Sequence, residues 1–243
     1  MYFEEEENEC DIKLKLPTMI CDKSLGRDIP HPFPSSHHFM VICGMPGGGK
    51  TSFALGTYFS KNGPLRKKFN NVYIVVPPTS RGSVKDDPFK NHNPKKMSDE
   101  LSLEFLHKVY TQGEVNPILK SPQNSLLYLD DVGAELKNKN IQKKLKQIIW
   151  NRRHLRTSIV MLCQNYKSLS LDLRKTISHL VCFKPSNLSE WGAIGSELLA
   201  IPKNQMQDLY DTVYQEPHDL LFAETNSGKL YRNFNHLNPI DTS

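Results

Sequence analysis

One stretch of the chain reads Gly44-Met45-Pro46-Gly47-Gly48-Gly49-Lys50-Thr51 and matches the phosphate-binding loop pattern G-x-x-x-x-G-K-[ST] in full. An apolar, strand-like run at residues 39–43 precedes it, and a helix-like stretch at 51–59 follows. Glycines in such a loop let backbone N–H groups turn toward a phosphate, and the helix N-terminus adds positive potential. A chance glycine-rich turn is the alternative, and the lysine, the hydroxyl and the strand together disfavour it. The pattern predicts a nucleotide site comprising these residues and Ser52.

Two side chains of this loop have expected roles. Lys50 is expected to contact the β- and γ-phosphates of ATP as a compact positive charge. The hydroxyl of Thr51 is expected to bind Mg²⁺. The sequence therefore predicts ATP and Mg²⁺ as the ligands of the loop.

A second motif consists of an apolar run at 126–129 that ends in two acids, Asp130 and Asp131. We expect Asp130 to hold Mg²⁺, which would neutralise phosphate charge as it develops, and Asp131 to accept a proton from the attacking water or to orient it. The alternative is an acidic turn that closes a strand before Gly133, and the phosphate loop makes that interpretation the weaker one. Gln164 ends another apolar run, where its amide is expected to contact the γ-phosphate or the water; a polar strand end that meets solvent is the alternative.

Bulk composition fits one soluble α/β domain. The chain has 243 residues, of which 38% are hydrophobic and 23% are charged. No apolar run approaches the ~20 residues of a membrane-spanning helix, and the acidic N-terminus does not have the shape of a signal peptide. The five cysteines are odd in number, and Cys43, Cys163 and Cys182 lie in apolar runs, so we expect buried thiols and a reducing compartment.

Positive charge is unevenly distributed although the net charge is only +5. One basic cluster spans 61–68, and we interpret it as part of a solvated surface. A second spans 137–156, where a nucleic-acid surface and a solvated helix face stay equally open. Some arginines have a third possible role, because a guanidinium from a neighbouring subunit accelerates phosphoryl transfer. The candidates for this role are Arg152, Arg153, Arg156 and Arg174, with DNA or surface contact as the alternative.

Apolar runs and turn signals predict strands that alternate with helices, and hence a mostly parallel central sheet with helices on both faces. The strands are expected at 39–43, 71–76, 126–129, 158–163 and 179–183, and a small C-terminal hairpin at 219–223 and 229–232. The helices are expected at 51–59, from Ser98 onward, at 141–156 and at 191–200, the last with Asn187 and Glu190 as capping residues. We divide the chain into an N-terminal arm, 1–37, with an edge-strand pattern at 11–16, and a P-loop ATPase domain, 38–243.

Taken together, these motifs resemble the viral genome-packaging ATPases of the FtsK/HerA superfamily, in the poxvirus-type branch of large DNA viruses, virophages and Maverick/Polinton elements. The matching stretches are the phosphate loop, the segment 128–131, and the arginine-histidine, apolar strand, glutamine block at 151–164. The segments 173–174, 183–187 and 216–221 also look similar to the family. The resemblance implies a RecA-like fold, a homo-oligomeric ring (hexamer or pentamer) and ATP-driven movement of double-stranded DNA into a capsid. It also implies Gln164 as a nucleotide sensor and Arg152, Arg153 or Arg174 as an arginine finger that acts in trans. Asp131 departs from the glutamate of many cellular relatives, which leaves its role as water activator open.

We therefore expect a DNA-translocating motor that works with a capsid or portal-like viral protein in the host cytoplasm or viral factory, or in association with the virion. The DNA grip is expected at the basic helix of Lys143, Lys144 and Lys146 or at loops within 79–96. Two alternatives remain. A P-loop kinase for a small molecule would transfer phosphate to an acceptor without DNA, and a nucleotide-switched scaffold would hydrolyse ATP slowly and bind a partner tightly.

Overall fold

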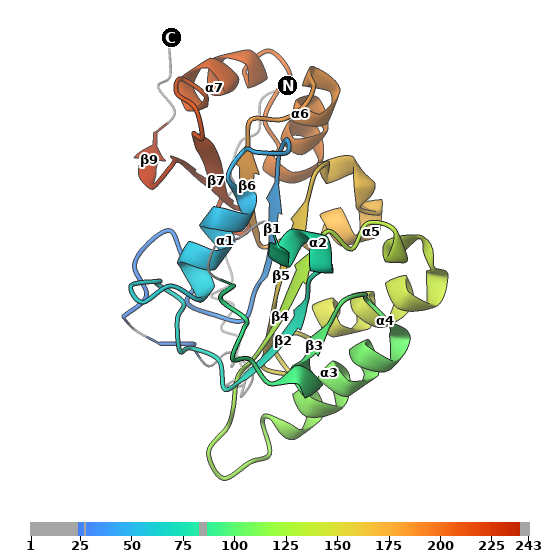
Figure 1. Ribbon diagram of the computed structural model, residues 1–243. Helices are drawn as coiled ribbons and strands as arrows, with labels where there is room; N and C mark the ends of the chain where they lie inside the picture. The colour runs from blue at the N-terminus through green and yellow to red at the C-terminus, as the bar shows by residue number, and fades with distance from the viewer. Residues whose placement is uncertain (1–23, 27, 83–86, 239–243) are drawn as a thin grey trace, which may run out of the picture.

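A single mixed sheet organises the computed structural model, which describes residues 24–26, 28–82 and 87–238 (Figure 1). Within the described residues its strands are β1 (Phe39–Cys43), β2 (Asn71–Val75), β3 (Met97–Ser98), β4 (Ser125–Asp130), β5 (Thr157–Cys163), β6 (His179–Phe183), β7 (Leu220–Glu224), β8 (Lys229–Arg232) and β9 (Asn235–Leu237). They lie in the order β3-β2-β4-β5-β1-β6-β7-β8-β9. Neighbours from β3 to β6 pair in parallel, and those from β6 to β9 pair antiparallel.

Helices and helical turns connect these strands. The α-helices are α1 (Lys50–Tyr58), α2 (Pro78–Gly82), α3 (Leu103–Val115), α4 (Lys139–Trp150), α5 (Leu171–Arg174), α6 (Leu188–Ile194) and α7 (Met206–Val213). Short 3-10 turns occur at η1 (Pro94–Lys96), η2 (Glu135–Lys137) and η3 (Tyr166–Ser168), and a π-helical turn, η4 (Gly195–Leu199), follows α6.

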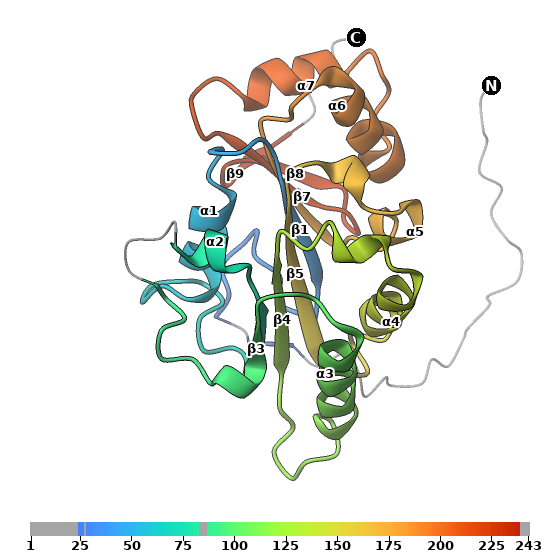
Figure 2. The same ribbon diagram turned by 45° about the vertical axis from the view of Figure 1, so that its right-hand side comes forward.

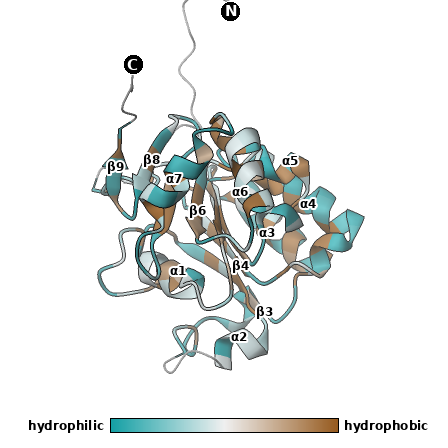
Figure 3. Ribbon diagram, turned by 90° about the horizontal axis from the view of Figure 1, so that it is seen from above, coloured by the Kyte–Doolittle hydropathy of each residue, from teal (hydrophilic) through white to brown (hydrophobic). Residues whose placement is uncertain are grey.

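The two faces of the sheet carry separate hydrophobic cores. On one face, side chains of α3, α4, α6 and α7 pack against alternate residues of the strands. On the other face, α1 and the aromatic residues near it pack against the remaining residues. Figure 2 shows the sheet edge-on between α1 and the pair α3 and α4. All residues of β1, β4 and β5 are buried, which explains their continuous apolar runs. In Figure 3 the central strands are largely hydrophobic, whereas the outer sides of α4 and α7 are hydrophilic.

Most predicted elements are confirmed, with differences at their ends. The helix predicted at 141–156 begins at Lys139 and already ends at Trp150. It stops because the chain turns: Thr157 N–H donates to the Arg152 carbonyl over 2.9 Å, and Arg156 has φ 48°. The helix predicted from Ser98 is wrong at its start, since Ser98 pairs in β3 and Ser102 caps α3 by accepting from Phe105 N–H over 3.1 Å. Asn187 caps α6, as predicted, by accepting from Glu190 N–H over 2.9 Å.

The C-terminal hairpin is confirmed, but it is part of the main sheet. Its first strand, β7, pairs along its whole length with β6, and β9 adds one more antiparallel strand. Sequence analysis did not predict β3, β9, α2, α5 or α7.

The described part of the predicted N-terminal arm packs on the domain. The ring of Phe33 lies 5.7 Å from that of Phe222, and His37 Nε2 lies 3.1 Å from Asn124 Oδ1. The division at residue 37 stays a prediction, and the edge-strand pattern at 11–16 lies outside the described residues.

Two predictions about composition are also tested by the fold. Cys43, Cys163 and Cys182 are buried free thiols, as predicted. Across the part of the chain that the structure describes, none of the helices combines the length and apolar character needed to cross a membrane.

Candidate nucleotide site

The phosphate loop joins β1 to α1 at the carboxyl edge of the parallel strands, where ligands of such sheets bind. Two of its glycines are required by backbone conformation or by close packing. Gly44 has φ 140°, and a Cβ there would lie 2.7 Å from Phe183 Cβ. Gly49 has φ 108° and begins α1 without a side-chain cap, so the N–H groups of the first turn, which contains Thr51 and Ser52, keep their capacity to bind an anion.

Lys50 lies within the loop. Its Nζ donates to the carbonyl of Gly44 over 2.8 Å and to that of Met45 over 2.9 Å. Burial lowers the pKa of the ammonium, and the negative charges of Asp130 and Asp131 act in the opposite direction. The lysine therefore lies within the electrostatic reach of both acids, as the two sequence motifs predict.

Asp130 ends β4 and is 7% exposed. Burial and, as a smaller cause, the charge of Asp131 raise its pKa to about 6, against the opposing charge of Lys50. Within the described residues its carboxylate has no hydrogen-bond or ion-pair partner. A carboxylate without such a partner, at the sheet edge that carries the phosphate loop, fits the oxygen ligands that Mg²⁺ prefers. Thr51 and Asp130 are thus chemically suited to the predicted metal site.

Asp131 and Gln164 lie beside Asp130. Asp130 is in register with Leu162 of β5, so the end of β4 and Gln164, just past the end of β5, share one edge of the sheet. Asp131, which has φ 52°, and Gln164 line a common cavity of about 230 Å³. The structure therefore brings together the predicted catalytic acid and the predicted sensor, while their roles stay predictions.

Arg152 and Arg153 do not join this site within one chain. Arg152 and Arg153 precede β5, whose seven residues separate them from Gln164 by about 20 Å at ~3.3 Å per residue. Arg156 holds the turn before β4, since its Nε donates to the Gln123 carbonyl over 3.0 Å.

Arg174 and Arg152 are both engaged within the chain. Arg174 Nη1 lies 2.5 Å from Glu197 Oε2, and its guanidinium packs 5.2 Å from the centre of the Tyr166 ring. Arg152 Nη1 donates to the Ile149 carbonyl over 3.0 Å. A contact with a neighbouring subunit by Arg152, Arg153 or Arg174 stays a prediction.

Part of the basic helix is also engaged internally. Lys144 Nζ lies 3.6 Å from the centre of the Tyr110 ring, and Lys146 forms a 2.6 Å ion pair with Asp172. Lys143 is exposed on the outer face of α4. Of the three lysines predicted for a DNA grip, Lys143 is therefore the one that presents its side chain to solvent.

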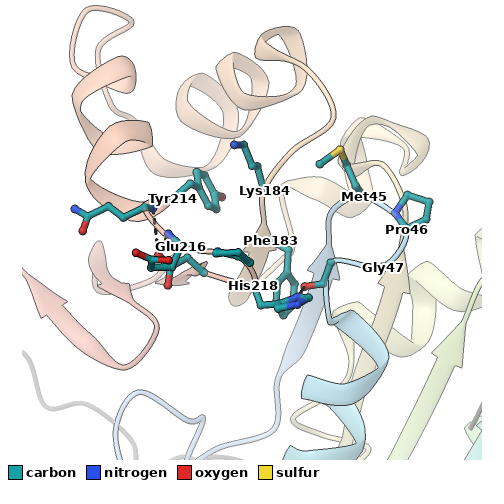
Figure 4. A pocket seen from close by; sticks show the side chains of 12 residues that line it. Met45, Pro46, Gly47, Phe183, Lys184, Tyr214, Glu216 and His218 are labelled. Carbon is teal, nitrogen blue, oxygen red and sulfur yellow. Dashed lines mark hydrogen bonds between the residues drawn. The ribbon is translucent and has the colours of Figure 1, made fainter.

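Sequence reasoning assigned no role to a group of residues on the other side of the loop, although 183–187 and 216–221 are among the stretches that resemble the family. Residues 214–219, together with Phe183 and Lys184, enclose a cavity of about 410 Å³ against residues 45–48. His218 Nδ1 lies 3.2 Å from the Gly48 carbonyl oxygen. Figure 4 shows Lys184 and Tyr214 on one side of the cavity and Met45 and Pro46 on the other. No local pattern indicates that these residues lie beside the loop, since His218 and Gly48 are 170 positions apart in the sequence.

Comparison with known proteins identifies relatives of the chain. A family model described as "Poxvirus A32 protein" matches residues 33–194. DNA packaging protein OPG160 of Variola virus and that of Vaccinia virus (strain Copenhagen) are each 31% identical over 156 residues, which cover 60% of this chain and 53% of theirs. The chain thus spans about half the length of these curated relatives.

Solved structures share the fold. The genome packaging NTPase B204 from Sulfolobus turreted icosahedral virus 2 in complex with AMP has a TM-score of 0.56 and 13% identity, over 84% of this chain and 98% of that one. Its complex with ATP-gammaS has a TM-score of 0.57 and 14% identity, over 83% and 98%. The type VII secretion ATPase EccC of Thermomonospora curvata has a TM-score of 0.54 and 12% identity, over 84% and 24%. The predicted α/β fold of P-loop ATPases is confirmed.

Proposed function

This chain belongs to the poxvirus A32 protein family, and from that membership we propose that it is an ATPase motor that packages a viral double-stranded DNA genome into a capsid. The names of its relatives, which are DNA packaging proteins, favour a motor over the small-molecule kinase and the nucleotide-switched scaffold.

In the proposed reaction, ATP binds with its phosphates over residues 44–52 and Lys50 contacts the β- and γ-phosphates. Mg²⁺ on Thr51 and Asp130 would supply positive charge to offset the charge that develops on the phosphates. Asp131 accepts a proton from the attacking water or orients it, and Gln164 contacts the γ-phosphate or that water. An arginine of a neighbouring subunit completes the site, with Arg152, Arg153 and Arg174 as candidates.

The remaining features of the motor follow from this role. Subunits form a homo-oligomeric ring, a hexamer or a pentamer, and hydrolysis resets surfaces that hold duplex DNA by its phosphates, largely independent of sequence. A capsid or portal-like viral protein is the docking partner. The protein acts in the host cytoplasm or viral factory, or in association with the virion.

One observation carries the proposal. Lys50 and the acids Asp130 and Asp131 lie within mutual electrostatic reach at one sheet edge, in a chain of a DNA packaging family. This is the arrangement that phosphoryl transfer requires, because a phosphate bound at the loop would face the carboxylates and the amide of Gln164.

The test is ATP hydrolysis by the full chain, with and without duplex DNA, over a range of protein concentrations. We expect hydrolysis that DNA stimulates and that rises more steeply than protein concentration as subunits associate. Lys50→Ala, at equal concentrations, is the matched control for contaminating activity. If the rate of hydrolysis per protein molecule changed neither with DNA nor with protein concentration in a well-folded protein, the motor would be overturned. Transfer of phosphate to a small acceptor would establish the kinase.

A further inference from the structure

The outer side of α4 carries positive charge that the described part of the chain leaves unpaired. Lys139, Lys143, Gln147 and Trp150 are exposed and recur every three or four residues, so they form one stripe along the helix, which we call the α4 stripe. The range 137–156 contains no aspartate or glutamate. Among the described residues, neither Lys139 nor Lys143 has an ion-pair or hydrogen-bond partner. The α4 stripe therefore offers two lysines to an acidic partner.

Trp150 gives the α4 stripe an apolar end. It is 60% exposed, whereas the other tryptophan of the chain, Trp191, is 2% exposed. An exposed indole ring packs well against other aromatic rings, and the phosphates of duplex DNA offer it no such surface. A partner that fits the whole α4 stripe therefore combines aromatic side chains with clustered acids.

We propose that residues 2–11 of this same chain are that partner and dock on the α4 stripe. The segment lies outside the described residues and reads Tyr2-Phe3-Glu4-Glu5-Glu6-Glu7-Asn8-Glu9-Cys10-Asp11. It has two aromatic side chains followed by six acids, and it has no lysine or arginine. The acids pair with the two lysines of the stripe, and the aromatic rings pack on Trp150. This docking does not rest on the proposed function.

The described chain begins at the edge of the sheet at which α4 ends. Leu25, near the first described residue, donates its N–H to the Ser35 carbonyl over 2.7 Å, just before β1 begins. β1 pairs in parallel with β5, and the turn 151–156 joins α4 to the start of β5. The beginning of the described chain and the end of α4 at Trp150 therefore share the amino edge of the parallel strands.

The residues between the acidic segment and the domain are numerous enough for a contact within one molecule. Residues 12–23 can span up to about 40 Å when extended, and α4 is about 18 Å long. A tethered segment has an effective concentration in the millimolar range, so ion pairs that are weak individually suffice for docking. At micromolar protein concentration the segment of the same molecule therefore outcompetes that of a second copy.

The first test is zero-length cross-linking of the full chain with a carbodiimide, which joins a carboxylate to an amine in direct contact. Trypsin releases residues 1–13 as one peptide that contains all six acids. We expect this peptide to be joined to Lys139 or Lys143, and the cross-links to be lost at 1 M salt, where the Debye length is about 3 Å. Lys61, exposed just after α1 on the other face of the sheet, is the matched control and should not be joined.

The second test is acrylamide quenching of tryptophan fluorescence, which reports on Trp150 because Trp191 is buried. The neutral-segment variant carries Glu4→Gln, Glu5→Gln, Glu6→Gln, Glu7→Gln, Glu9→Gln and Asp11→Asn. Its quenching constant should exceed that of wild type by about 2-fold, the change expected when a covering contact is half populated. Wild type should reach the value of the variant at 1 M salt, because salt screens the ion pairs. Glu100→Gln and Asp208→Asn, at exposed positions outside the segment, are the control variants and should leave quenching unchanged.

Every result decides for or against the docking. Cross-links to Lys139 or Lys143, together with weaker quenching in wild type than in the neutral-segment variant, establish it. Cross-links to Lys61 at equal yield overturn it, because a segment that is tethered without docking reaches both faces of the sheet. Equal quenching of wild type at low and high salt also overturns it, and this comparison needs no variant to fold.

A mixture of unlabelled and isotope-labelled protein identifies the molecule that supplies the segment. We expect both halves of each cross-linked peptide pair to carry the same label. Pairs of mixed label at the yield expected for random exchange would assign the contact to a second copy and overturn the docking within one molecule.

Discussion

Acid sensitivity of the fold should depend on His37, which is 3% exposed. Its Nε2 lies 3.1 Å from Asn124 Oδ1, an oxygen that also accepts from Arg156 Nη2 over 2.8 Å. Because Asn124 Oδ1 is an acceptor, neutral His37 donates through Nε2. Burial, the largest cause, and the charge of Arg156 lower the pKa of the ring from 6.5 to about 4, against the hydrogen bond to Asn124, which raises the pKa.

The direction of the effect follows from proton linkage. Between pH 6.5 and 4 the unfolded chain binds a proton at His37 and the folded chain does not, so stability falls as the pH falls through this window. With these two pKa values, the loss at pH 5 is about 2 kcal/mol relative to pH 7.5. For a protein of this size that is a difference of about 4–8 °C in Tm.

The perturbation is His37→Gln, which keeps an amide donor for Asn124 Oδ1 and removes the titration. At pH 7.5 the variant should be as stable as wild type or less stable by up to about 1 kcal/mol. From pH 7.5 to 5 it should gain about 2 kcal/mol relative to wild type, as measured by urea unfolding followed by circular dichroism. His38 and His179, whose pKa values burial also lowers, are common to both proteins and cancel in the comparison.

His107→Gln is the control, because His107 is exposed on α3. It should show no relative gain at low pH. If the stability difference between His37→Gln and wild type were the same at pH 5 and pH 7.5, the argument that burial keeps His37 neutral would be refuted.

Three further predictions concern the site. Lys50→Ala should abolish turnover because the charge on the β- and γ-phosphates is lost, and phosphate release measured beside wild type should fall to the level of a blank; substantial residual turnover would contradict the role of the lysine. Asp131→Ala should bind Mg²⁺–ATP in calorimetry yet fail to hydrolyse it, whereas normal turnover would show that its catalytic assignment is wrong. Arg174→Ala should lower the free energy of unfolding by about 1–2 kcal/mol because it breaks the ion pair with Glu197. Lys61→Ala, at an exposed position, should change that energy by less than about 0.5 kcal/mol, and equal losses would contradict the structural role of Arg174.

Local patterns were sufficient for the elements around the phosphate loop. The run 39–43 is buried on both faces, so its unbroken apolar pattern gives the bounds of β1 directly. Asp130 and Gln164 could be placed at one edge because the carboxyl ends of parallel strands converge. This half of the candidate site could be predicted from the sequence because each of its residues lies at the end of an apolar strand.

The predicted ends of helices were wrong where tertiary contacts override local sequence signals. Leu155 continues the apolar spacing of α4, yet it is buried from a separate turn and its carbonyl accepts from Asn116 Nδ2 over 3.0 Å. Ser98 and Ser102 are both capable of capping a helix, and pairing with β2 assigns Ser98 to a strand. In both cases a contact with a residue distant in the sequence is involved: Asn116 for Leu155 and Ile74 to Val75 of β2 for the strand of Ser98.

The other half of the candidate site has a cause that no single segment contains. His218 meets Gly48 because β7 pairs antiparallel with β6, with Leu220 opposite Phe183, so the turn before β7 arrives at the same edge as the phosphate loop. A parallel strand after β6 would have brought its carboxyl end there and left the segment 214–219 at the opposite edge. The reversal of one strand direction therefore encloses the cavity and brings His218 against the phosphate loop, a contact that no residue within 44–52 determines by itself.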